Sequence, residues 1–223
     1  PVPSKTPPGG VAARPVANTA GLASLGIPPR AAQTPPNLLD LSAFYNAGFE
    51  GNGLEGGGDN DFSELPVGIQ ELAGTRFDVR GLIQLHGNKA DTNRFPERIT
   101  GLPVSGKWQR IHFLHGLLWV TGRRNAVAKY VVHYADGTTS ERPIVLQKDV
   151  LNWWTMPNES DEDGPTLAWS GHNPATRRLK NRQTIQIYKT TWENPTPDIE
   201  ITRIDFISTR KGGDPFLFAI TVE

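Results

Sequence analysis

"KYVVHYADGTTSERPIVL", residues 129–146, is the clearest local structural signal in the sequence. Two runs rich in β-branched and aromatic residues flank the pair Asp136-Gly137. Asp-Gly is a preferred pair for the tight primed turn that joins two antiparallel strands. The stretch therefore predicts a β-hairpin, and the same two-residue period can be sought in the segments around it.

The segments on both sides of this hairpin also have the composition of strands. FDVRGLIQL, residues 77–85, alternates apolar and polar positions, and RIHFLHGLLWV, residues 110–120, is apolar on both faces, as is typical of a central strand. No window predicts an amphipathic helix longer than about three turns. About seven or more short strands with Gly and Pro turns predict an all-β protein, an antiparallel β-sandwich. The expected one-face sets are Phe77, Val79, Ile83 and Leu85 in the first segment, and Phe216, Phe218, Ile220 and Val222 in the final PFLFAITVE.

Composition divides the chain into two parts. The first 36 residues contain nine of the 19 prolines, with Ala, Gly and Ser between them, and have neither a helical nor a strand period. Such composition is typical of semi-extended linkers that cannot bury a core. We therefore predict a Pro-rich linker over residues 1–36 and one β-sandwich domain over residues 37–223. Because the sequence starts at Pro1 without Met, we expect a piece of a longer protein, tethered to another domain.

The bulk composition disfavours several partners. The 23 basic residues balance the 23 acidic ones, so long-range electrostatics favour neither nucleic acid nor an anionic membrane. No run approaches the roughly 20 apolar residues of a membrane span, and no signal peptide opens the chain. Without Cys, the chain has no disulfide and no thiolate metal site. We expect neither nucleic-acid binding nor membrane insertion.

Motifs for catalysis are weak. His112 and His115 lie three residues apart on a predicted strand, so they would point to opposite faces and could not share a zinc ion. No G-x-S-x-G motif is present for a serine nucleophile. The two carboxylates of a glycoside hydrolase come from distant positions and would leave no local signal. An enzyme is therefore the least favoured of the functions considered, and we expect none.

Two acidic loops offer the oxygen ligands that Ca²⁺ prefers. Neither has the full spacing of a calcium loop with its closing Glu, so solvated acidic turns are the alternative. The residues are Asp59, Asn60, Asp61 and Glu64 in the first loop, and Glu159, Asp161, Glu162 and Asp163 in the second. The sequence leaves open whether Ca²⁺ binds, and where.

Four of the six tryptophans lie within about 40 residues of one another, next to amide or charged residues. A sugar ring presents a flat apolar face and a rim of hydroxyls, so a sugar site needs an aromatic platform beside planar polar groups. Trp153 and Trp154 end a predicted strand, where one would fill the core and the other would face a ligand at the rim. Large aromatic residues usually fill cores, so we expect this of some of the four. The predicted ligand-binding residues are Asn152, Trp153, Trp154, Trp169, His172 and Asn173.

The order of several segments resembles a known family. They are LDLSAFYNAGF, LPVGIQELAGTRFDVRGLIQL, KWQRIHFLHGLLW, AKYVVHYADGTTSERPI, DVLNWW, LAWSGHN, YKTTWENPTPDIEITRIDF and FLFAITVE. Over about residues 38–223 they resemble the galactose-binding-like β-sandwich (jelly-roll) domains that accompany bacterial glycoside hydrolases and large cell-envelope proteins. The resemblance implies an extracytoplasmic accessory domain with a carbohydrate-binding role, often one structural Ca²⁺, and no catalytic machinery. It also implies that Trp192, in the WENP segment, packs at a strand end.

Two functions fit these patterns. The first is a non-catalytic carbohydrate-binding module of a larger bacterial protein, holding a polysaccharide or oligosaccharide. Its ligand would be neutral or weakly charged, because the chain has no net charge. The alternative is a structural or protein-interaction domain of an envelope protein, which an exposed apolar patch away from the tryptophans would favour.

Overall fold

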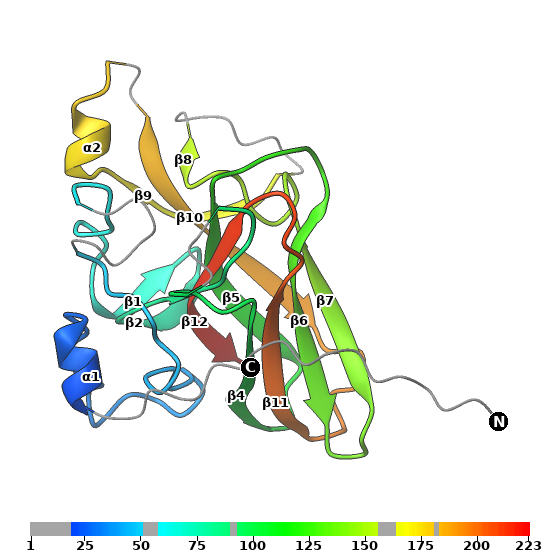
Figure 1. Cartoon of the computed structure of the whole chain (residues 1–223). Helices are drawn as coiled ribbons and strands as arrows, with labels where there is room; N and C mark the ends of the chain where they lie inside the picture. Colours follow the sequence, from blue (N-terminus) through cyan, green and yellow to red (C-terminus); the bar gives the residue numbers. More distant parts are fainter. Residues whose placement is uncertain (1–18, 51–57, 90–92, 156–163, 181–182) are drawn as a thin grey trace.

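The computed structural model describes residues 19–50, 58–89, 93–155, 164–180 and 183–223. Within these residues the chain forms twelve strands and two short helices (Figure 1). The helices are α1 (Thr19–Ser24) and α2 (Pro174–Arg177). The strands are β1 (Gly68–Leu72), β2 (Thr75–Val79), β3 (Ile83–Gln84), β4 (Arg98–Gly106), β5 (Arg110–Leu118), β6 (Ala126–Tyr134), β7 (Thr139–Val145), β8 (Trp154–Thr155), β9 (Thr166–Gly171), β10 (Thr184–Glu193), β11 (Ile201–Ser208) and β12 (Asp214–Val222).

The protein is an all-β antiparallel sandwich, which confirms the predicted fold class. One sheet has the order β4-β11-β6-β7, and the other has the order β3-β12-β5-β10-β8, with β9 also paired to β10. The hairpin β1-β2 forms a small third sheet, and every paired set of named strands is antiparallel. Among the described residues, no helix has the length and apolar character needed to cross a membrane.

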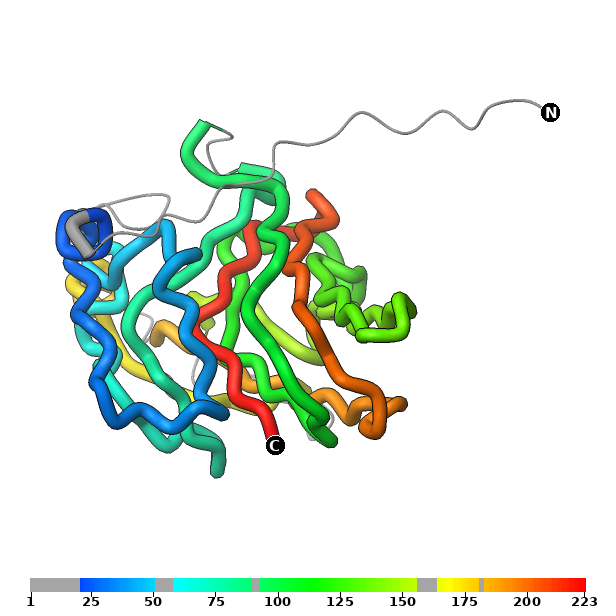
Figure 2. The backbone as a smooth tube through the Cα atoms, turned by 90° about the horizontal axis from the view of Figure 1, so that it is seen from below, coloured from blue at the N-terminus to red at the C-terminus, as the bar shows by residue number. Residues whose placement is uncertain are grey.

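The six-stranded sheet is buried on both faces. On β5, Ile111, Phe113 and Leu117 enter the inter-sheet core, between the two sheets, and Leu114 and Leu118 enter a second, outer core. The outer core is closed by residues before, within and after the β1-β2 hairpin, which are Ala47, Phe49, Phe62, Leu65, Leu72, Phe77, Val79, Leu82 and Phe95. Figure 2 shows β12, in red, between the N-terminal chain on one side and the green and orange strands on the other. All nine residues of β12 are accordingly buried.

The hairpin predicted at Asp136-Gly137 is present as β6 and β7, but its turn is of another type. Gly137 has φ +86°, and Asp136 is not in the left-handed region. The Gly137 N–H donates to Tyr134 O, and the Tyr134 N–H donates to Thr138 O. These bonds define a type I turn followed by a glycine bulge rather than the expected two-residue primed turn. The Asp136 carboxylate stabilises it by accepting from the Thr138 N–H at 2.9 Å.

Both one-face sets predicted from alternation are divided between the two cores. FDVRGLIQL is broken at Gly81, so Phe77 and Val79 enter the outer core while β3 carries Ile83 into the inter-sheet core. A Cβ at Gly81 would lie 2.9 Å from Ile27 Cδ1, so the break allows close packing there. In β12 a bulge between Leu217 and Ala219 shifts the register against β5. It places Phe216 and Phe218 in the outer core, and Ile220 and Val222 in the inter-sheet core.

The folded part of the chain begins before the predicted boundary at residue 37. Residues 1–18 of the predicted linker lie outside the described residues, but residues 19–36 pack against the sandwich. Ile27 is 4 % exposed and belongs to the inter-sheet core, with Leu25 beside it. Gly48 allows this approach, because a Cβ there would lie 1.9 Å from Leu25 O.

Buried charges fasten the same segment. Arg80 and Asp78 are only 2 % and 3 % exposed, and Arg80 Nε donates to Asp78 Oδ2 at 3.0 Å. Arg80 Nη2 also donates to Asp40 Oδ1 at 2.9 Å, and Arg30 Nε lies 3.8 Å from Asp78 Oδ2. Because a buried charge without its partner is costly, this network ties residues 30–40 to β2 and its exit.

Ile27→Ala tests whether this segment is part of the folded unit. Removing a fully buried aliphatic chain from the core should lower the free energy of unfolding by about 2–4 kcal/mol. Urea unfolding followed by circular dichroism measures the change. The control is Val67→Ala, at a side chain that is 49 % exposed, which should change the value by no more than about 0.5 kcal/mol. Equal effects of the two variants would contradict the packing.

The two histidines of β5 point to opposite faces, as predicted. His115 is 1 % exposed and shares hydrogen bonds with the Tyr130 hydroxyl at 3.2 Å and the Thr190 hydroxyl at 2.9 Å. His112 instead hydrogen-bonds the Thr191 hydroxyl at 2.9 Å on the other face. Burial lowers the pKa of His115 from 6.5 to about 4, so this ring is neutral in the folded protein at neutral pH.

Neutral His115 should make stability fall with acidification. Between about pH 6.5 and pH 4 the unfolded chain binds a proton at this position and the folded chain does not, so the free energy of unfolding decreases as pH falls. From pH 7 to pH 5 the contribution is about 2 kcal/mol. Thermal or urea unfolding of the wild type and of His115→Gln at both pH values measures it. Parallel pH dependences of the two proteins would contradict a depressed pKa at His115.

Candidate functional site

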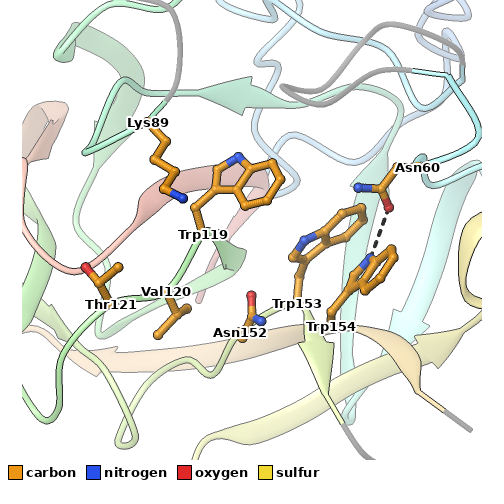
Figure 3. Close-up of a pocket in the computed structure, with 8 residues that line it drawn as sticks. All are labelled: Asn60, Lys89, Trp119, Val120, Thr121, Asn152, Trp153 and Trp154. Carbon is orange, nitrogen blue, oxygen red and sulfur yellow. Dashed lines mark hydrogen bonds between the residues drawn. The ribbon is translucent and has the colours of Figure 1, made fainter. Parts of the chain in front are cut away.

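A cavity of about 300 Å³ opens where β5 ends beside β8 (Figure 3). Three indole rings surround it, and they come from two separate segments of the chain. The described residues that line it are Asn60, Lys89, Trp119, Val120, Thr121, Asn152, Trp153 and Trp154. The wall combines aromatic surface with amide, hydroxyl and ammonium groups, and none of these lining residues is acidic.

Trp153 and Trp154 are placed by backbone bonds on both sides of their segment. The Trp153 N–H donates to Leu117 O at 2.9 Å, and Trp153 O accepts from the Gln186 N–H at 2.7 Å. Trp153 is 4 % exposed, and its ring centroid lies 4.9 Å from that of Phe62 in the outer core. Trp154 is partly exposed. Trp153 is therefore the core residue of the pair, and Trp154 is the one at the rim.

The two rings do not face opposite ways as adjacent residues on a regular strand would. Their centroids are 6.2 Å apart with planes tilted by 42°, and both line the cavity. Trp153 precedes β8, which contains only Trp154 and Thr155, so strand alternation does not fix its direction. The pair forms one continuous aromatic wall.

Trp119 supplies the opposite aromatic wall and was missed by the sequence analysis. It follows the last residue of β5, has φ +52° and is 38 % exposed. A bulky side chain in the left-handed region is an outlier, and such backbone conformations concentrate at functional sites. Its sequence signal is its place two residues before Thr121-Gly122, near the end of the apolar run RIHFLHGLLWV.

Lys89 lies over the Trp119 ring, with Nζ 5.5 Å from the ring centroid (Figure 3). Its loop is held by Asp214, which is fully buried. Asp214 Oδ1 accepts from the backbone N–H groups of Gly87 at 2.6 Å, Asn88 at 2.7 Å and Lys89 at 3.2 Å. A carboxylate that accepts several backbone N–H bonds fixes a loop firmly. The position of Lys89 is thus set by the start of β12.

Asn60 is oriented by two donors behind it. Its Oδ1 accepts from Trp154 Nε1 at 3.0 Å and from Asn173 Nδ2 at 3.1 Å. Asn173 is fully buried and caps α2 through its Oδ1, which accepts from the Thr176 N–H at 2.8 Å. Asn173 therefore positions Asn60 and Trp154 and does not itself line the cavity.

The other predicted ligand-binding residues are divided between the cavity and its surroundings. Asn152 lines the cavity, and its amide makes no hydrogen bond to the described residues. Trp169, on β9, is partly buried against the outer core, and His172 donates its backbone N–H to Glu64 Oε2 at 3.0 Å. Neither of these two lines the cavity. Trp192 is 9 % exposed in the inter-sheet core, as the resemblance implied.

The first acidic loop uses its described carboxylates within the protein. Asp59 Oδ2 accepts from Arg178 at 2.6 Å, and Glu64 pairs with Arg177, whose hydrogen bond holds the pKa of Glu64 below its ordinary value. Asp61 Oδ1 accepts from the Ser63 N–H at 3.1 Å. Among the described residues, no three His, Cys, Asp or Glu side chains are grouped as a candidate metal site. Glu159, Asp161, Glu162 and Asp163 of the second loop lie outside the described residues.

Comparisons with known proteins add no homologue to this geometry. No protein-family model matches the sequence, and no curated protein matches it either. The residues of the cavity are therefore the basis for assigning a function.

The left-handed backbone at Trp119 can be tested by two substitutions that both remove the ring. Trp119→Gly should be more stable than Trp119→Ala by about 1 kcal/mol, because only glycine adopts positive φ without steric cost. The same pair at Leu118, within β5, should have the opposite order. Urea unfolding of the four variants gives both differences. An alanine variant as stable as the glycine variant at position 119 would contradict the strain.

Proposed function

We propose that this protein is a non-catalytic carbohydrate-binding module that holds one sugar unit of a glycan between Trp119 and the Trp153-Trp154 wall. The observation that carries the proposal is the cavity itself, in which three indole rings meet amides with unused hydrogen-bonding atoms. The resemblance to galactose-binding-like jelly-roll domains supports the same role, and with it an extracytoplasmic, bacterial accessory domain tethered to a larger protein.

The dimensions and chemistry of the cavity suit one sugar ring. Its volume of about 300 Å³ is at the lower end of the range for small-molecule sites. Trp119 and Trp154 offer exposed indole surface for the apolar C–H face of a sugar, and Asn60 and Asn152 offer amide atoms for its hydroxyls. The described lining includes no carboxylate pair of the kind that glycoside cleavage needs, which supports a binding role over a catalytic one.

A structural or protein-interaction role has less support. Val67 is 49 % exposed and Ile69 is 37 % exposed, both at the β1 strand or its start. Two neighbouring side chains cover much less area than the contiguous apolar patches that mark protein interfaces, and the other exposed aliphatic residues of the described chain, Leu167 and Leu179, lie on β9 and after α2. The aromatic cavity is the stronger feature of the surface.

A glycan-array screen, run once with Ca²⁺ and once with a chelator, tests the proposal and its dependence on the metal. At least one glycan should bind, and Trp119→Ala or Trp154→Ala should weaken its binding by about 1–3 kcal/mol, as expected of aromatic anchors. Trp169→Ala is the matched control, because Trp169 is partly buried but lies outside the cavity. Near-ultraviolet circular dichroism checks that each variant keeps its fold. Binding lost on Trp169→Ala but kept on Trp119→Ala would refute the site, and no binding in either condition would refute the function.

A further inference from the structure

We infer that the sugar bound in this cavity carries a carboxylate, as uronic acids do, and that Lys89 binds this group. The inference rests on the proposed function and adds the chemical class of the ligand. It departs from the expectation of a neutral ligand, which used only the net charge of the whole chain. The hydrogen-bond donors and charges around the cavity favour an anionic sugar instead.

The cavity wall is rich in hydrogen-bond donors. Because Asn60 Oδ1 is occupied by Trp154 and Asn173, its Nδ2 is the part left for a ligand, and Figure 3 shows this nitrogen on the side of Trp119. Thr121 Oγ1 accepts from Asn88 Nδ2 at 3.0 Å, so its own O–H remains to donate. The Lys89 ammonium adds three more N–H groups, none of them bonded to an acidic described residue.

Acceptors are few by comparison. Among the side chains of the described lining, the acceptor positions left for a ligand are the amide oxygen of Asn152 and the second lone pair of Thr121 Oγ1, since both lone pairs of Asn60 Oδ1 are used. A neutral sugar has hydroxyl groups that both donate and accept, and each O–H hydrogen needs an acceptor. A carboxylate only accepts. The wall is therefore more complementary to a sugar with a carboxylate than to one with hydroxyls alone.

The charge at this end of the sandwich is also suitable. Lys89 is exposed, and its backbone N–H donates to Asp214 Oδ1 at 3.2 Å. The Thr121 N–H donates to Gly212 O at 2.9 Å, which joins the cavity segment to the loop before β12. These two loops carry the exposed side chains of Arg123, Arg124 and Lys211, none in an ion pair with another described residue. Among the described residues, these cationic side chains add positive charge to the two loops next to the cavity, which favours an anionic ligand.

Titration calorimetry tests the inference by measuring the affinity of uronate oligomers and of their methyl esters. The oligomers are those of galacturonate, glucuronate and the uronates of alginate, each paired with its own ester. The ester keeps the sugar and removes the charge. At least one acid should bind about tenfold more tightly than its ester, because a hydrogen bond to a charged group is stronger than one to a neutral group. Lys89→Met should remove about this factor for the acid and weaken the ester by a clearly smaller factor, because the ester carries no charge.

Lys107→Met is the matched control. Lys107 is exposed and precedes β5, so it lies at the opposite end of this strand from Trp119, about 30 Å away. It should leave both affinities unchanged. A tenfold loss with this variant as well would show a general charge effect and would overturn the assignment to Lys89.

The outcomes separate the inference from the proposed function. Equal binding of acid and ester, both lost on Trp119→Ala, would overturn the carboxylate and keep the carbohydrate-binding function. A neutral glycan bound while every uronate fails would do the same. Equally tight binding of a sulfated glycan without uronic acid would replace the carboxylate by a general anion. Failure of the wild type to bind any acidic or neutral oligosaccharide would overturn both.

Discussion

The constraint on which the rest of the structure depends is the burial of the six-stranded sheet on both faces. β5 and β12 lie in its centre, and each places side chains in two separate cores. One face is covered by the four-stranded sheet, and the other must be covered by residues outside the sandwich. This need accounts for the long N-terminal region, which packs Phe49, Phe62 and Phe77 against Phe216 and Phe218 of β12.

Local features of the two central strands follow from this double burial. The bulge in β12 lets two phenylalanines enter the outer core before Ile220 and Val222 return to the inter-sheet core. Gly116 of β5 lies opposite Phe216, and a Cβ there would lie 2.4 Å from the Phe216 ring. A glycine in a central strand costs stability, but here it provides space for an aromatic ring of the neighbouring strand.

The candidate site lies at the end of β5, next to the residues that close the outer core. β5 ends at Leu118, and the next residue turns its indole toward the Trp153-Trp154 wall. The segment before β1 contributes Asn60, which is held by buried Asn173. The loop after β3 contributes Lys89, which is held by buried Asp214. Hydrogen bonds from buried residues to the lining residues preorganise a binding site, which reduces the entropic cost of binding.

The sequence by itself determined that the chain folds into short antiparallel strands and where the β6-β7 hairpin turns. These properties depend on composition, turn residues and the period of neighbouring positions. Only the tertiary structure decided which face each strand residue takes, because one bulge or one break at glycine reverses the alternation without a signal in the pattern. It also decided the site, since Asn60, Lys89, Trp119 and Asn152 are distant in sequence and are brought together by burial of the sheet between two cores.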